Sequence, residues 1–353
     1  MTRSDMPDQE RIPPEGPNRE TVGSTAPVSS VRPARILVVD LLGGLGDLVM
    51  VLPVIHALHR RHRDAELRVL THQPGDVLLR HDPAVTTVAC AERGRERPAV
   101  LAELDRWRPD LVVSTTRYDG IADAIEELAP QSVTNLWRSP PPDEPVGARY
   151  LRILASEHMI DPRDVDMAPR IVLTDAERIG GEQALDDEVR PVVLVPAAGM
   201  AVKQWPHWRQ LATALAGRAL VVGEPAVLDA WRGGPARLLP PLSLRELAAV
   251  FAAVGRRGGV VVGGDTGPMR VAAAVGARTV GIFGPTPAAR YGLGPLGVDL
   301  QGLPGCPHRQ PTSITEQVCW WEAQCPLSPV GPACMADVTP NRVLDLVPVP
   351  ALH

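Results

Sequence analysis

The feature that most constrains the fold is a repeated alternation of short apolar runs with amphipathic segments. Residues 35–40 form a run rich in β-branched side chains, and the glycine-containing stretch 43–47 joins it to an apolar-periodic segment at 48–61. This order predicts a strand, a turn and a helix. The same pattern predicts strands at residues 67–71 and, as the third of the block, 111–114, and helices at 121–128 and 148–156. Strands that alternate with helices indicate a parallel, doubly wound α/β sheet.

A second block of the same kind begins with the apolar run 191–196. It predicts further strands at 219–223, 259–263 and 279–283, and helices at 208–215, 244–254 and 269–275. We therefore expect two Rossmann-like units in tandem. Ligands of open α/β sheets bind outside the carboxyl ends of the strands, so two such units place two ligands on either side of one cleft.

The length of 353 residues fits two domains of common size. The first 33 residues have no apolar periodicity and no hydrophobic signal-peptide core, which predicts a disordered tail. The expected organisation is a tail at 1–33, a first domain at 34–175, a linker at 176–190, a second domain at 191–338 and a C-terminal helix and tail at 339–353.

The composition excludes several classes of protein. A net charge of -5 without a basic block argues against a nucleic-acid partner, because affinity for phosphate backbones needs clustered Lys and Arg. No apolar run reaches the roughly 18 residues that span a bilayer, so we expect a soluble protein, with peripheral membrane contact left open. With no export signal the expected location is the cytoplasm, where disulfides are rare.

The segment that carries the most specific chemistry is residues 262–274, which begins Val-Gly-Gly-Asp-Thr-Gly-Pro-Met-Arg. Asp265 and Thr266 suit the N-cap of a helix that starts near Pro268, and Gly267 lets a ligand approach the backbone. The free N–H groups and dipole of such a helix end favour a diphosphate. The alternative is an ordinary capped helix. A second loop, Gly284-Pro285-Thr286, follows the next predicted strand.

One basic residue differs in type from all the others. Of the 36 Lys and Arg residues, 35 are Arg, and the only lysine is Lys203. Either a GC-rich genome left one lysine by chance, or this position needs a compact ammonium on a flexible stem.

These motifs together resemble glycosyltransferase family 9, the heptosyltransferase family. Asp-Thr-Gly-Pro-Met before an Ala-rich helix, the later Phe-Gly-Pro-Thr, the stretch 36–53 with Gly-Leu-Gly-Asp, and Lys203-Gln204-Trp205-Pro206 occur in the family's order. The resemblance covers most of residues 35–345. It implies the GT-B fold, with an acceptor-binding N-terminal domain and a C-terminal domain that binds a nucleotide sugar.

The resemblance also implies roles for individual residues. Asp47 matches the proposed general base, with helix capping as its alternative role. Lys203 matches the lysine that contacts the donor phosphates, which makes it the second catalytic candidate and replaces a divalent metal. Glu224 follows a strand end, where a carboxylate can bind ribose hydroxyls, although surface glutamates are common. The donor-binding candidates are Lys203, Glu224, Asp265, Thr266, Gly267, Pro268, Met269, Arg270, Gly284, Pro285 and Thr286, and the acceptor-side loop is Gly43, Gly44 and Gly46.

The chain also departs from the family pattern. Arg270 stands where the family usually has His, and it either pairs with phosphate or lies on a solvated helix face. Leu41-Leu42-Gly43-Gly44 replaces the usual Ser or Arg-Ser, which weakens the case for an anionic lipopolysaccharide acceptor. Arg60, Arg61 and Arg63 form either a positive face or a solvated helix end, and the solvated helix end is favoured.

Two further patterns resemble metal sites. Cys306, Cys319, Cys325 and Cys334 fall in one segment without a Cys-x-x-Cys pair, so buried thiols are favoured over a metal or a disulfide. Asp164-Val165-Asp166 has the Asp-x-Asp spacing of metal-dependent transferases but no preceding strand, and we discount it.

The resulting prediction is an inverting, metal-independent glycosyltransferase that uses no cofactor. Its partners are an ADP-heptose or a related nucleotide sugar and a hydroxyl or amine acceptor, either a small secondary-metabolite precursor or a lipid-linked saccharide. The alternatives are a nucleotide-sugar epimerase or hydrolase on the same fold, and a non-catalytic nucleotide-sugar-binding partner protein. A nicotinamide dehydrogenase is disfavoured because residues 41–47 lack the G-x-G-x-x-G spacing.

Overall fold

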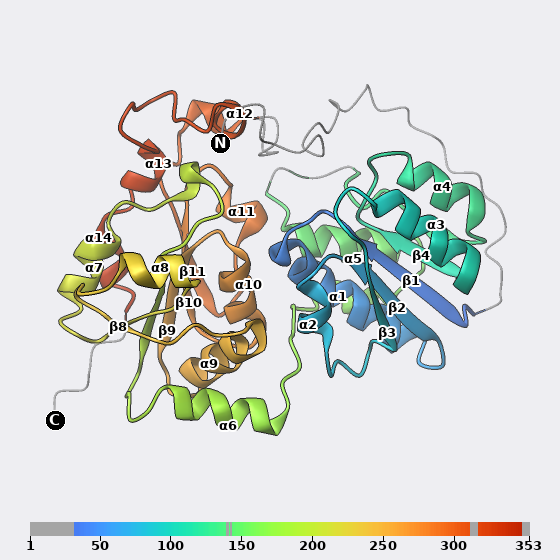
Figure 1. Ribbon diagram of the computed structural model, residues 1–353. Helices are drawn as coiled ribbons and strands as arrows, with labels where there is room; N and C mark the ends of the chain where they lie inside the picture. Colours follow the sequence, from blue (N-terminus) through green and yellow to red (C-terminus); the bar gives the residue numbers. More distant parts are fainter. Residues whose placement is uncertain (1–31, 139–140, 142, 311–316, 348–353) are drawn as a thin grey trace.

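The structure is a computed structural model that describes residues 32–138, 141, 143–310 and 317–347. Residues 1–31 of the predicted tail, part of the Pro-rich loop near residue 140 and the last six residues lie outside the described residues. Two parallel sheets, each flanked by helices, lie side by side (Figure 1).

The first sheet has the strand order β3-β2-β1-β4-β5 and is parallel throughout. Its central strand, β1, pairs Ile36 with Leu67 of β2 on one side and with Leu111 of β4 on the other. The strand at residues 111–114 is therefore the fourth and not the third, because β3 precedes it in the chain. The strands are β1 (Arg35–Asp40), β2 (Glu66–Thr71), β3 (Thr87–Cys90), β4 (Leu111–Ser114) and β5 (Ser132–Val133).

The second sheet has the order β11-β10-β9-β6-β7-β8 and is also parallel. The chain moves outward from β6 to β8 and then returns to place β9 beside β6. The four strands predicted in this block agree with the structure to within two residues. The strands are β6 (Val192–Val195), β7 (Ala219–Val221), β8 (Arg237–Leu238), β9 (Val260–Gly264), β10 (Thr279–Phe283) and β11 (Gly297–Gln301).

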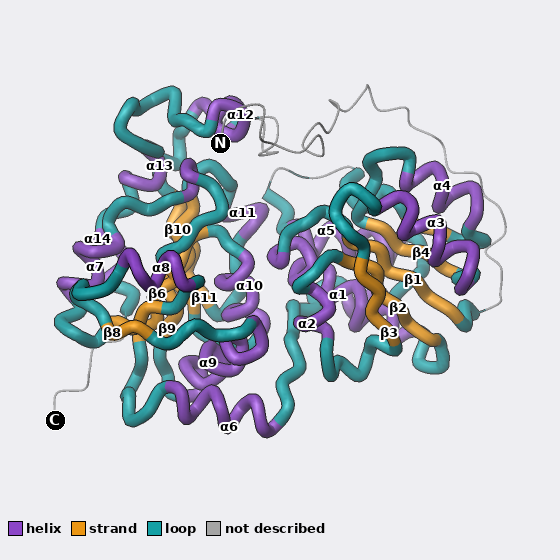
Figure 2. The backbone as a smooth tube through the Cα atoms, viewed as in Figure 1, coloured by secondary structure: helices purple, strands orange, loops and turns teal. Residues whose placement is uncertain are grey.

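Helices cover both faces of each sheet, as the purple and orange segments of Figure 2 show. In the N-terminal half the helices are α1 (Leu45–Arg61), α2 (Gly75–Leu79), α3 (Glu96–Trp107), α4 (Ile121–Leu128) and α5 (Val146–Ser156). In the C-terminal half they are α6 (Asp175–Ala184), α7 (Trp208–Ala214), α8 (Pro225–Ala230), α9 (Leu244–Arg256), α10 (Gly267–Ala274), α11 (Ala288–Tyr291), α12 (Val318–Glu322), α13 (Ala333–Ala336) and α14 (Pro340–Leu344).

The core explains why the strands have continuous apolar sequences. Ile36 and Val38 of β1 pack with α1 and α5, whereas Leu37 and Val39 pack on the opposite face with α3 and α4. Since both faces are buried, every side chain from Ile36 to Val39 is apolar instead of every second one. The cluster around Ile36 continues through α1 into α9 and α10 of the other half. The two halves therefore share one apolar contact, centred on the packing of α1 against α10.

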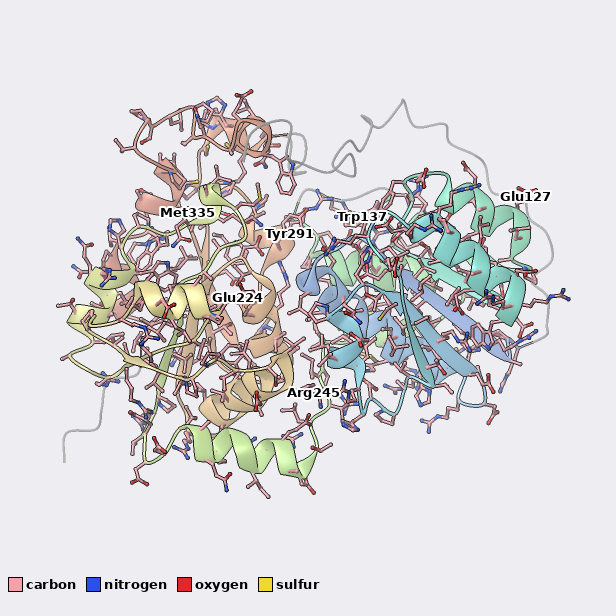
Figure 3. All side chains as sticks on the ribbon, in the orientation of Figure 1. Glu127, Trp137, Glu224, Arg245, Tyr291 and Met335 are labelled. Atoms are coloured by element: carbon pink, nitrogen blue, oxygen red, sulfur yellow. The ribbon has the colours of Figure 1, made fainter. Side chains whose placement is uncertain are left out.

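Residues 175–184, in the stretch predicted as a linker, form helix α6. Thr174 and Glu177 make a capping box at its start, which satisfies free N–H groups of the first turn. The helix packs on α9 so closely that Gly181 meets the backbone of Ala249. Arg245 of α9 donates to Glu177 at 2.7 Å and to the carbonyl of Leu78 in the N-terminal half at 3.1 Å, and Figure 3 places it at the junction of the two halves.

Candidate active site

A carboxylate with a cation on each oxygen lies at the carboxyl edge of the second sheet. The Nζ of Lys203 donates to Oδ2 of Asp265 at 2.8 Å, and the Nη2 of Arg270 donates to Oδ1 at 2.8 Å. All three side chains are largely buried, with 17% of Lys203, 8% of Asp265 and 9% of Arg270 exposed. Burial opposes ionisation, but Arg270 and Lys203 outweigh it and hold the pKa of Asp265 below its usual value. The group is an ion cluster with one net positive charge.

The topology of the sheet brings this cluster together. Lys203 ends the short 3₁₀ turn η3 (Ala201–Lys203) in the connection that follows β6, and Asp265 follows β9 directly. The strand order reverses between β6 and β9. A crevice opens at such a reversal because the two connections leave in opposite directions, and open α/β sheets bind ligands there.

The N-terminus of α10 lies beside the cluster. Thr266 is the N-cap residue in extended conformation, but its side chain makes no capping bond. Its hydroxyl oxygen is buried and has no hydrogen-bond partner among the described residues. Gly267 and Pro268 form the first turn and stay half-buried. This helix end thus presents free N–H groups and an unused hydroxyl, the donors that suit an anion.

Two of the donor-binding candidates in α10 serve contacts within the protein. Met269 is fully buried, and its sulfur fills the space where Gly263 has no side chain, so only its backbone remains available to a ligand. Arg270 is also buried, at 8% exposure, and donates to the carbonyl of Tyr291 at 2.8 Å. The solvated-face interpretation of Arg270 is therefore wrong.

The loop 284–286 follows β10, next to β9. Thr286 is buried there, with 2% exposed. Gly284 lies against Met335 and Cys334, and a Cβ at this position would lie 2.3 Å from the Met335 sulfur. Close packing against α13, whose Met335 is labelled in Figure 3, explains why this position has a glycine.

The predicted acceptor loop meets the donor segment directly. Helix α1 begins at Leu45 instead of Leu48, so Asp47 lies in its first turn and accepts from the Gly44 N–H at 3.1 Å. Gly46 faces Gly267 and the Arg270 side chain, and a Cβ on Gly46 would lie 3.1 Å from Cδ of Arg270. The first turns of α1 and α10, which carry the two sets of predicted site residues, are therefore in contact.

The electrostatics of Asp47 reflect this contact. Burial raises the pKa of Asp47 above its usual value, while Arg270, the Gly44 N–H and Lys203 act in the opposite direction. Asp47 thus lies within electrostatic reach of the whole Lys203–Asp265–Arg270 cluster. A carboxylate of raised basicity and a buried ammonium, from different halves of the chain, share one site.

The comparisons with known proteins assign the chain to a family. The sequence profile described as glycosyltransferase family 9 (heptosyltransferase) matches residues 131–313, more than half of the chain. The chain belongs to glycosyltransferase family 9. A comparison with curated proteins finds no match.

Solved structures show the same fold as this family 9 enzyme. Escherichia coli ADP-heptose lps heptosyltransferase II has a TM-score of 0.64 at 19% identity, over 88% of this chain and 96% of that one. E. coli heptosyltransferase WaaC with ADP has 0.59 at 18%, over 88% and 98%. The iron-containing dodecameric glycosyltransferase TibC from enterotoxigenic E. coli H10407 has 0.51 at 16%, over 89% and 76%. The predicted resemblance and the GT-B fold are confirmed.

Sequence reasoning missed one buried acid of the transferase, Asp40. It ends β1, is 2% exposed and accepts from the Thr115 hydroxyl at 2.6 Å. Burial and the charge of Asp47 raise its pKa to about 7, against the bond from Thr115. Asp40 also lines a pocket with Gly43, Gly44 and the connection after β2. A lone acid that ends an apolar strand was the available signal.

Other candidates of the transferase lie apart from the cluster or serve other contacts. Glu224 is exposed at the N-cap of α8 and makes no capping bond; Figure 3 shows it on the C-terminal half. Arg60 pairs at 3.0 Å with the buried Asp164 of the discounted Asp-x-Asp. Because α1 has 17 residues, this pair lies roughly 20 Å from Asp47, at the other end of the helix.

The four C-terminal cysteines line one pocket together with His308 and Arg309. All four are free thiols; Cys319 and Cys334 are buried, and Cys306 and Cys325 are half-buried. Burial raises the pKa of Cys334 to about 11. Within the described ranges, no three His, Cys, Asp or Glu side chains are placed to hold a metal ion. Independence from metals stays a prediction.

Among the helices of the described ranges, none is both long enough and apolar enough to cross a bilayer.

Proposed function

We propose that this family 9 enzyme transfers a heptose from an ADP-heptose or a related nucleotide sugar to a hydroxyl or amine, with inversion and without a metal ion. The observation that carries the proposal is the position of Asp47 within reach of Lys203 and the α10 N-terminus. The similar structures include an ADP-heptose lps heptosyltransferase and WaaC with ADP, which supports the choice of donor.

The proposed chemistry is a single displacement. Asp47 takes the proton of the acceptor hydroxyl as that oxygen attacks the anomeric carbon, and the bond from this carbon to the diphosphate breaks. The electron pair leaves with the diphosphate. Attack on the face opposite the leaving group inverts the anomeric centre.

The leaving group needs charge stabilisation. The Lys203–Asp265–Arg270 cluster has one net positive charge, and the hydroxyl of Thr266 and the first N–H groups of α10 lie beside it. Fixed donors of this kind stabilise a developing anion because they need no reorganisation during the reaction. We propose that Lys203, Thr266 and Gly267 hold the departing diphosphate, and that Asp265 orients Lys203 and Arg270.

We propose that the acceptor binds in the pocket lined by Gly43, Gly44 and Asp40. Asp40 lines this pocket and Asp47 lies within electrostatic reach of Asp40, so the two acidic groups suit an acceptor that carries hydroxyl or amine donors. A small secondary-metabolite precursor and a lipid-linked saccharide both carry such groups.

The test is to incubate the purified protein with ADP-heptose and EDTA, with and without candidate acceptors, and to measure ADP and the sugar products. Transfer predicts ADP release that depends on the acceptor and resists EDTA. Acceptor-independent turnover points to an epimerase or hydrolase, and donor binding without turnover for every acceptor points to a non-catalytic binding protein. Asp105→Asn, an exposed carboxylate on α3, is the matched control for Asp47→Asn.

A further inference from the structure

The least explained buried charge in the molecule is the guanidinium of Arg149, on α5. Its side chain is fully buried, and none of its three nitrogens makes a hydrogen bond to any described residue. Among the described residues, its one ion contact is with Oε2 of Glu144, at 3.5 Å from Nε. Glu144 is already occupied, because Arg152 donates to both of its oxygens at 2.6 and 2.9 Å.

An arrangement of this kind is costly for a protein. A buried charge without hydrogen bonds loses its hydration and gains little in return. Five N–H donors in a planar fork match the oxygens of a phosphate or a carboxylate. The surroundings of Arg149 therefore suit a ligand that brings such oxygens.

The nearest groups hold Arg149 in place without satisfying its donors. The guanidinium lies over the ring of Trp137, with 5.7 Å from Cζ to the ring centroid. Trp137 in turn packs edge-on against Tyr150, with the ring centroids 5.4 Å apart. Aromatic faces attract a cation but accept no conventional hydrogen bond. The side chain is thus fixed in direction while its N–H groups make no hydrogen bond to a described residue.

A second arginine approaches Arg149 from the other half of the chain. Arg290 of α11 is 8% exposed. After burial, its charge is the largest influence that lowers the pKa of Arg149, so the two cations lie close enough to repel each other. Figure 3 shows Tyr291, the next residue, at the edge of the C-terminal half that faces Trp137. Two buried cations from opposite halves create a site where an anion relieves the repulsion.

The position of this arginine pair links it to the proposed reaction. The carbonyl of Tyr291 accepts from Arg270, which binds Asp265. Tyr150 and Tyr291 both lie within electrostatic reach of Asp47. The arginine pair therefore borders the space that the substrates are proposed to occupy.

We propose that Arg149 and Arg290 together bind one anionic group, a phosphate or a carboxylate, across the two halves of the enzyme. The anion comes either from the diphosphate of the donor or from a charged group on the acceptor. This inference rests on the proposed function only for the identity of the substrates, since anion binding is measurable without turnover.

The experiment measures binding by calorimetry in wild type, Arg149→Met and Arg290→Met, first with ADP and then with inorganic phosphate on the ADP-saturated protein. If the donor supplies the anion, both variants weaken ADP binding by about 10- to 100-fold. If the acceptor supplies it, ADP affinity is unchanged and the phosphate binding seen in wild type is lost. Arg106→Met, an exposed arginine on α3, is the control and retains both affinities.

A purely structural role for Arg149 gives a different result. Without ligand, the proposal predicts that Arg149→Met keeps or raises the melting temperature, because a buried charge without hydrogen bonds is removed. Added phosphate then raises the melting temperature of wild type more than that of the variant. Wild-type affinities for both ADP and phosphate in folded Arg149→Met overturn the proposal. If that variant does not fold, wild-type affinities in both Arg149→Lys and Arg290→Met overturn it equally.

Discussion

Lys203 donates to the carboxylate of Asp265 at 2.8 Å, on the oxygen that Arg270 leaves free. One acid therefore sets the position of two cations that come from separate connections of the sheet. The ammonium is the only one supplied by a side chain in the sequence, and it is held where a departing phosphate is proposed to lie.

Asp265→Asn tests this dependence. The substitution leaves two buried cations with no anion, and we expect the free energy of unfolding to fall by about 2–4 kcal/mol. Saturating ADP should restore part of the loss, because its phosphates then neutralise the cations. Urea unfolding with and without ADP measures both effects.

Asp229→Asn is the control for this change, because Asp229 pairs with Arg232 on the surface, with 62% and 78% exposed. Exposed pairs contribute little to stability. Equal losses in the two variants contradict the role assigned to Asp265.

Asp47→Asn removes the proposed base. We expect kcat to fall by about 10²- to 10⁴-fold while ADP affinity changes little. Because burial raises the pKa of Asp47, the wild-type rate should rise with pH above the range of an ordinary carboxyl group. This rise should be absent from the residual activity of the variant. A pH–rate profile that keeps its acidic limb in Asp47→Asn assigns that limb to another group.

Asp40→Asn should stabilise the protein in a pH-dependent way. The folded-state pKa of Asp40, about 7, lies above its ordinary value, so the native state binds this proton more tightly than the unfolded chain does. The stabilising contribution is complete below pH 4 and is lost as the pH rises through 7. The variant keeps a neutral side chain and avoids the loss.

The gain of Asp40→Asn over wild type should be on the order of 2–4 kcal/mol at pH 8 and close to zero below pH 4. Urea unfolding at the two pH values measures this gain in the free energy of unfolding. The matched variant Asp105→Asn should show no such dependence. A gain that does not change with pH rules out titration of Asp40 as its cause.

The strands that sequence reasoning predicted well are those buried on both faces. The residues of β9 and β10 are all buried, so apolar runs marked them to within one residue. Strand β3 was missed because it is an edge strand with half-exposed and exposed residues, and its apolar run Val-Ala-Cys is short and has only one β-branched side chain. A strand that is buried on both faces needs apolar side chains throughout, so its sequence predicts it. An edge strand is partly exposed and lacks this pattern.

The site likewise has some features that the sequence predicts and others that it does not. The family resemblance assigned Lys203 and Asp265 to the donor site from two separate motifs. That the strands before them, β6 and β9, are neighbours is known only from the observed strand order. The approach of Arg149 to Arg290, in contrast, depends on how α5 and α11 pack between the halves. No local pattern encodes that packing.

The contact between α1 and α10 gives the last prediction. A Cβ on Gly267 would lie 3.0 Å from Cβ of Leu45 and 3.4 Å from the backbone nitrogen of Gly46. Neither atom moves without the first turn of α1, which carries Asp47. Gly267→Ala should therefore push the first turn of α1, and with it the proposed base, away from the phosphate site by a few tenths of an ångström. Because a shift of about 1 Å costs about 10²-fold in rate, this smaller shift should lower transfer by roughly 3- to 10-fold. Gly180→Ala is the control, because Gly180 lies inside α6 with open space around it. There the alanine should add about 0.5–1 kcal/mol of stability and leave transfer unchanged.

Steady-state rates and urea unfolding curves of the two variants separate a positional effect from a general loss of stability. Equal transfer rates in Gly267→Ala and wild type exclude the contact of the two glycines as a determinant of the reaction.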